Sequence, residues 1–128
     1  MSECRVIKSG AGEQGAIGVS YERGLSAESV GARGICMHLG TIPPGGSAAA
    51  HKHEGHESVI YVLSGTARME YGEQLEHHVD AEAGDFVYVP AGVPHRPYNL
   101  SDSEPARFVV ARTDPNEEES VVLLPDLA

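Results

Sequence analysis

The chain has 128 residues, a formal net charge of −10, and ordinary globular proportions of hydrophobic (41%) and charged (22%) residues, which together predict a single folded domain over residues 1–128. The negative charge disfavours binding to nucleic acid phosphates and to anionic lipid surfaces. No apolar run approaches the roughly 20 residues that span a bilayer. From the charge and the absence of such a run, we expect neither nucleic acid nor membrane partners.

The start of the chain and its cysteines indicate the compartment. Residues 1–5 lack the basic-then-apolar order of a signal peptide. Cys4 and Cys36 are far apart and form no C-x-x-C motif, so we expect both thiols to be reduced. These features predict a cytoplasmic protein.

Taken in chain order, the sequence predicts an all-β protein. Fifteen Gly and eight Pro interrupt the chain every few residues, which leaves little room for an amphipathic helix. Short runs that are rich in Val, Ile, Tyr and Phe and bounded by turn residues predict about nine strands. These are residues 5–8, 16–21, 34–42, 58–63, 66–71, 75–79, 85–89, 107–112 and 120–124.

Turn residues between these runs predict how the strands pair. Ser64-Gly65 and the segment 71–73 stand between apolar-alternating runs, as in tight hairpins where φ must become positive. We therefore expect antiparallel neighbours, and many short strands in one small domain favour a jelly-roll sandwich or barrel. The last run, 120–124, is apolar enough to pair with a second subunit, and we expect a homodimer.

Histidines gather in one short segment. His51, His53 and His56 fall within six residues. Because alternate residues of a strand face the same side, His51 and His53 present two imidazoles about 6.6 Å apart along the chain. Neutral imidazole is a ligand for zinc, iron, copper and nickel, so this pair predicts a metal site.

A third ligand must come from elsewhere in the chain. His95 follows Pro94 after the predicted strand 85–89, where a rigid, proline-rich turn would hold it in place. We therefore take His95 as the third candidate. Without it, the H-x-H pattern is equally typical of an exposed polar pair on a strand.

Two longer motifs surround these histidines. The first spans residues 45–65 and contains His51 and His53, and the second spans residues 84–99 and contains His95. In order and spacing they resemble the two signature motifs of the cupin superfamily, and the second fits at every defined position. The resemblance implies a double-stranded β-helix of the jelly-roll type that is often dimeric. It also implies one divalent metal ion per subunit (Fe, Zn, Mn, Ni or Cu) inside the barrel, bound by three histidines and a carboxylate.

The carboxylate is where the sequence departs from the family pattern. Its usual position, seven residues before the closing Gly65, is Ser58, and Glu57 lies one residue away. A one-residue offset turns a strand side chain to the opposite face unless a β-bulge intervenes, whereas His56 has the matching parity. His56, Glu57 through a bulge, and water are therefore three alternatives for the fourth ligand.

Other histidines and aromatic residues have plainer interpretations. His77 and His78 are adjacent and hence on opposite strand faces, and we expect them to lie outside the metal site. His38 lies in an apolar run and is expected in the core. We expect five further residues to line the core and the barrel: Tyr61, Tyr88, Tyr98, Met37 and Met69.

Metal binding is the only chemistry that the sequence predicts. The sequence contains neither a nucleophile elbow nor a phosphate-binding glycine loop. We favour a metalloenzyme that acts on a small organic molecule, of the oxygenase, isomerase or cyclase type. The alternative is a non-catalytic cupin that binds metal or senses a small ligand.

Overall fold

Two antiparallel β-sheets form the body of the protein in a computed structural model, which describes residues 3–8, 13–14, 19–116 and 120–127. In spatial order the first sheet contains β1 (Glu13–Gln14), β2 (Ser20–Leu25), β3 (Cys36–Ile42), β10 (Ala106–Arg112), β5 (Ser58–Ser64) and β8 (Phe86–Val89). The second sheet contains β11 (Val121–Leu123), β4 (His51–His53), β9 (His95–Asn99), β6 (Thr66–Tyr71) and β7 (His77–Glu82). A short helix, α1 (Ala27–Val30), lies between β2 and β3 in the chain.

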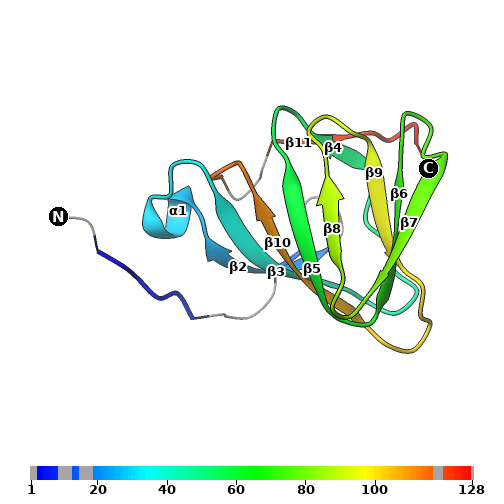
Figure 1. Cartoon of the computed structure of the whole chain (residues 1–128), viewed down its shortest axis with the longest axis horizontal. Helices are drawn as coiled ribbons and strands as arrows, with labels where there is room; N and C mark the ends of the chain where they lie inside the picture. Colours follow the sequence, from blue (N-terminus) through cyan, green and yellow to red (C-terminus); the bar gives the residue numbers. More distant parts are fainter. Residues whose placement is uncertain (1–2, 9–12, 15–18, 117–119, 128) are drawn as a thin grey trace.

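The strand order is that of a jelly roll. β10 lies between β3 and β5, and β9 lies between β4 and β6, so strands distant in the sequence become neighbours. Figure 1 shows the second sheet, with β9, β6 and β7, beside β5 and β8 of the first. The predicted all-β, jelly-roll fold is confirmed. In the described ranges, no helix is long and apolar enough to cross a membrane.

Several strand boundaries differ from the prediction. Residues 5–8 form no strand. The first half of the predicted strand 16–21 lies outside the described residues, and β2 begins at Ser20. The predicted turn around His95 is in fact the start of β9, which pairs with β6 along its length. Pro97 is accommodated in this strand, where its carbonyl accepts a hydrogen bond from the Ala48 N–H at 2.9 Å.

The predicted hairpin at Ser64-Gly65 is instead a corner between the sheets. β5 belongs to the first sheet and β6 to the second. Gly65 has a φ of 83°, and an added Cβ would lie 2.5 Å from the Pro105 carbonyl oxygen. This corner therefore requires glycine. The turn at Gly72, with a φ of 113°, does join two paired strands, β6 and β7, as predicted.

An apolar core lies between the sheets. Its buried members are Val19, Tyr21, Ile42, Ala48, Ala106 and Val110. His38 is buried beside this core, where its Nδ1 accepts a hydrogen bond from the Gly24 N–H at 3.0 Å and its ring meets that of Tyr21 edge-on. The expected core position of His38 is confirmed.

The first sheet also carries an apolar surface on its outer side. We call this the outer apolar face, and it consists of Met37, Val59, Tyr61, Phe86 and Tyr88, all of them exposed. Tyr61 and Phe86 are cross-strand neighbours, and their ring centroids are 4.8 Å apart. The expected core position is wrong for Tyr61 and Met37, because the alternate residues of β5 and β3 occupy the interior. Tyr88 is also exposed but lines a hollow that reaches His95, and Met69 is buried as expected.

Candidate metal centre

Three histidines meet where β4 pairs with β9. His51 and His53 are alternate residues of β4, and His51 is the cross-strand neighbour of His95. Ring centroids are 4.2 Å apart for His51 and His95, 5.1 Å for His51 and His53, and 5.5 Å for His53 and His95. Each imidazole offers a nitrogen within 4.8 Å of the others. The structure thus brings together the three histidines that the sequence singled out.

Backbone carbonyls orient two of these rings in the same way. The His51 Nδ1 lies 2.7 Å from the Ala49 carbonyl oxygen, and the His95 Nδ1 lies 2.9 Å from that of Val93. A neutral imidazole that donates from Nδ1 keeps the lone pair of Nε2 for a metal. The Nε2 of His51 is buried and has no hydrogen-bond partner among the described residues. A buried nitrogen in this state fits a metal ligand.

Burial keeps these imidazoles neutral. Desolvation, followed by the nearby His95, His53 and Arg112, lowers the pKa of His51 to about 2. Desolvation, with His53 and Arg112, lowers the pKa of His95 to about 4. Metal binding needs unprotonated imidazole, so both residues are ready to bind an ion at neutral pH without first losing a proton.

Hydrogen bonds fix the two strands that carry the histidines. β11 pairs with β4 of the same chain, so the strand expected to reach a second subunit already has a partner within its own. At the far end of β9, the amide nitrogen of Asn99 donates to the carbonyls of Ile42, Pro43 and Glu104 at 2.7–3.3 Å. These bonds fix the end of β9 to the end of β3 and to two neighbouring loops, and so help to position His95.

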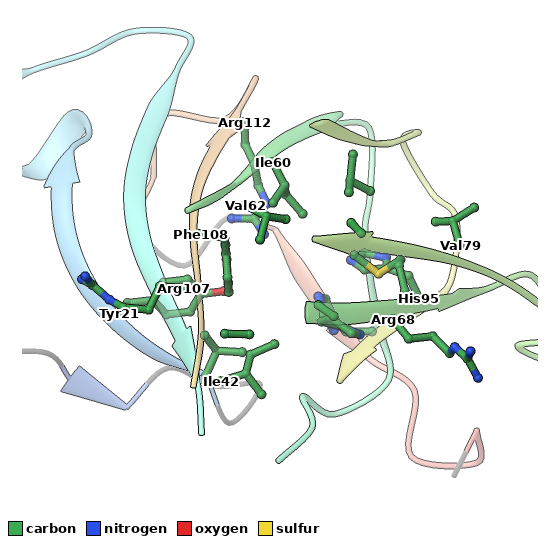
Figure 2. A pocket seen from close by; sticks show the side chains of 18 residues that line it. Tyr21, Ile42, Ile60, Val62, Arg68, Val79, His95, Arg107, Phe108 and Arg112 are labelled. Carbon is green, nitrogen blue, oxygen red and sulfur yellow. The ribbon is translucent and has the colours of Figure 1, made fainter. Parts of the chain in front are cut away.

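A pocket between the sheets reaches the histidines. His51 and His95 lie in its wall beside apolar side chains that include Ile60 and Val62 from the first sheet. Figure 2 shows Arg112, Ile60 and Val62 on one side of the pocket and His95 and Val79 on the other. A second hollow, lined in part by Tyr71, Tyr88 and Val93, also reaches His95. A small molecule in either space would lie against the imidazoles.

The family of the chain follows from a comparison with family models. A model described as a cupin domain matches residues 38–112, which is more than half of the chain and includes all three histidines. The chain belongs to the cupin family. This match confirms the family membership that the two sequence motifs indicated.

Solved structures of oxalate decarboxylase resemble this cupin. A serine-to-alanine mutant of the Bacillus subtilis enzyme matches 94% of the cupin with 27% identity and a TM-score of 0.70. The formate complex of the Lactobacillus farciminis enzyme matches 88% with 22% identity and a TM-score of 0.74. Another structure of the Bacillus subtilis enzyme, 26% identical over 94% of the cupin with a TM-score of 0.70, concerns its Mn(II) centers.

The relatives are longer than this cupin. It covers 30% and 33% of the first two decarboxylase chains. An uncharacterized protein of Methanocaldococcus jannaschii is 25% identical over 83 residues, which make up 65% of the cupin and 63% of that protein. In each case the cupin spans less than two thirds of the relative.

The two protein candidates for a fourth ligand are not part of the three-histidine group. The His56 Nδ1 lies 2.9 Å from the Thr113 carbonyl oxygen, and its Nε2 lies 3.6 Å from Asp114. Glu57 precedes β5 and is exposed, and its carboxylate accepts a hydrogen bond from the Tyr88 hydroxyl. Both side chains thus have partners elsewhere in the chain.

Two buried residues that the sequence did not single out as ligands are cross-strand neighbours, and one of them lines the pocket. Ser58, at the usual position of the family's carboxylate, is buried, and its hydroxyl has no hydrogen-bond partner among the described residues. Its cross-strand neighbour Arg112 is 5% exposed and lines the pocket. The alternation of β10 could have indicated this inward arginine, because Val110 and Phe108 are inward at the same parity.

Proposed function

We propose that His51, His53 and His95 bind one divalent metal ion, and that this cupin is a metalloenzyme acting on a small organic molecule. The observation that carries the proposal is the convergence of three buried imidazoles, two of which direct Nδ1 to a backbone carbonyl. A bound metal would supply Lewis-acid or redox chemistry of the isomerase, cyclase or oxygenase type. The side chains hold the ion, and the apolar pocket walls keep bulk water from the ligand.

Water or the substrate is our proposal for the remaining ligands of the metal. Three histidines leave coordination positions open, as catalytic sites require. The partners of His56 and Glu57 at Thr113, Asp114 and Tyr88 support this choice over either side chain. His56 would then position the loop that contains Thr113 and would not bind the ion.

Mn(II) is the metal that we propose to test first among Fe, Zn, Mn, Ni and Cu. The Mn(II) centers of the similar Bacillus subtilis oxalate decarboxylase support this order. Neutral imidazoles alone do not discriminate strongly among divalent first-row metals. The reaction catalysed by those longer enzymes is one candidate for the activity of this cupin.

A non-catalytic metal-binding or ligand-sensing cupin is the second candidate. It is favoured by one observation, the presence of Ser58 where the family's carboxylate usually lies. Turnover of any small organic substrate by the metal-loaded protein would exclude it. The cytoplasmic location inferred from the sequence stays a prediction under either function.

A homodimer is also part of the proposal. The outer apolar face is the surface that supports it, since Phe86 is 82% and Tyr88 58% exposed. Contiguous apolar surface of this kind is a common subunit interface. Because this face lies on the outer side of the first sheet, a second copy docked there would leave the pocket between the sheets uncovered in each subunit. Tyr88 would place the contact beside the second hollow.

Substitution of single histidines tests the metal site. His95→Ala should abolish stoichiometric metal binding, because two imidazoles bind a divalent ion far more weakly than three. The matched control is His77→Ala, which removes an exposed histidine on β7 and should bind one equivalent. Metal content is measured by elemental analysis, with circular dichroism to establish folding. Retention of a full equivalent by folded His95→Ala would refute the assignment.

A further inference from the structure

The second hollow beside His95 is larger than the pocket between the sheets. Its volume is about 270 Å³, whereas that of the pocket between the sheets is about 50 Å³. One water needs about 10–15 Å³, and an apolar cavity of about 150 Å³ holds benzene. The pocket between the sheets therefore has room for a few waters, while the second hollow has room for an organic molecule with one ring.

The second hollow lies between strands of the two sheets. β8 of the first sheet contributes Tyr88, and β6 and β7 of the second sheet contribute Tyr71 and Val79. Tyr71 is the cross-strand neighbour of His95, so the two side chains lie on the same face of the second sheet. A molecule in the second hollow would therefore contact an imidazole that is a candidate metal ligand.

The lining of the second hollow favours a neutral, aromatic ligand. Its described members contain no Asp, Glu, Lys or Arg, and an unpaired charge in such surroundings is unfavourable. Tyrosine rings and the methionine sulfur make favourable contacts with an aromatic ring. Apart from His95, the described lining consists of Met69, Tyr71, Val79, Tyr88, Val89, Pro90 and Val93.

The Tyr88 hydroxyl gives this lining a hydrogen-bond acceptor. It donates its hydrogen to the Glu57 carboxylate, so lone pairs of the Tyr88 oxygen remain for a donor on a ligand. The negative charge of Glu57 beside Tyr88 also disfavours an anionic ligand. A ligand hydroxyl group meets both conditions, because it donates a hydrogen bond and carries no charge.

We propose that the second hollow binds the substrate, and that the substrate is a neutral molecule with one aromatic ring and a hydroxyl group that donates to the Tyr88 oxygen. The volume sets the limit of one ring, and the lining sets the preference for an uncharged, aromatic body. The inference rests on the proposed function, since the metal held in part by His95 would lie beside the same molecule.

The first test compares four small probes on the wild-type protein. Calorimetric titrations of the metal-loaded and metal-free forms use phenol, anisole, cyclohexanol and benzoate. Phenol should bind about fivefold more tightly than anisole, which lacks the donor, and than cyclohexanol, which lacks the aromatic ring. Benzoate, an anion, should bind about tenfold more weakly than phenol. No binding of phenol, or equally tight binding of any other probe to the metal-free form, would overturn the proposal.

Methyl NMR spectra locate the bound ring. The ring current of phenol should shift the methyl resonances of Val89 and Val93, which line the second hollow but not the pocket between the sheets. The methyl resonances of Ile60 and Val62, which line only the pocket between the sheets, should not shift. Shifts at Ile60 and Val62 with none at Val89 and Val93 would contradict the assignment.

Tyr88→Phe tests the hydrogen bond. It should weaken phenol binding about fivefold, to the affinity of the wild type for anisole, while anisole binding and metal content stay unchanged. The matched control is Tyr61→Phe, which removes the hydroxyl of another exposed tyrosine of the outer apolar face outside the described lining. It should bind phenol as the wild type does. Unchanged phenol binding by Tyr88→Phe would refute the role of Tyr88.

The two proposals fail in different ways. Wild-type protein that holds metal but shows no preference for phenol would overturn the second hollow as the substrate site and leave the metal site standing. Protein that holds no metal but prefers phenol, with the expected shift at Val93, would overturn the metal site and leave the second hollow standing.

Discussion

Individual histidines should make the metal-free protein sensitive to acid. The pKa of His51 is lowered to about 2 and that of His95 to about 4 by burial and neighbouring cations, whereas both are near 6.5 in the unfolded chain. Between pH 6.5 and about 4 the unfolded state therefore binds more protons than the folded state. The stabilisation is complete above pH 6.5 and is lost as the pH falls through this range.

The predicted size of this effect is measurable by urea unfolding. Each of the two histidines should lower the free energy of unfolding by about 1.4 kcal/mol per pH unit within the window. His95→Gln should flatten the dependence by about that amount, while the exposed control His77→Gln should not. A wild-type protein and a His95→Gln variant with the same pH slope would show that His95 is not buried in the neutral form.

Single residues also show what the sequence could and could not predict about the site. His51, His53 and His95 follow from strand alternation and motif spacing, both of which are local properties of the chain. The place of Arg112 in the pocket lining was not predicted, because it depends on how β10 packs against the strands that carry the histidines, which are distant in the sequence. The parity argument against Glu57 agrees with its exposed position beside Tyr88.

At the scale of strands, the sequence predicted the class of fold better than the pairing. The strand β9 was mistaken for a turn because Pro94 and Pro97 normally interrupt strands, although Pro97 here contributes its carbonyl to a hydrogen bond. Ser64-Gly65 carries the same local signal as a hairpin, yet it is a corner between sheets. Turn residues predict where the backbone changes direction, but they do not predict which strand the next segment pairs with.

The outer face of the first sheet makes a prediction about assembly. The wild-type protein should sediment as a dimer, and Phe86→Glu on β8 should sediment as a monomer, because it places a charge in the outer apolar face at its most exposed residue. Leu100→Glu is the matched control, since Leu100 is also exposed but lies outside that face, and it should remain a dimer. Analytical ultracentrifugation distinguishes the two states. A monomeric wild type, or a dimeric Phe86→Glu variant, would refute this interface.

At the scale of the whole molecule, an acidic protein contains a pocket whose described lining is cationic and apolar. The net charge of −10 disfavours contact with nucleic acid and anionic surfaces, whereas the described pocket lining contains arginines and no Asp or Glu. Composition could indicate only the first of these properties, because the sum of charges conceals where each one lies. The fold separates them by directing alternate strand residues inward and outward.

The central claim is that three histidines of this cupin bind one divalent metal ion, and elemental analysis of the purified, untagged wild-type protein tests it most directly. The protein is expressed in medium that contains all five candidate metals and is then dialysed against metal-free buffer. We predict one equivalent of a single divalent metal per chain, with Mn(II) the first candidate. A protein that is folded by circular dichroism but holds no metal, and takes up none when each ion is added back, would contradict the account.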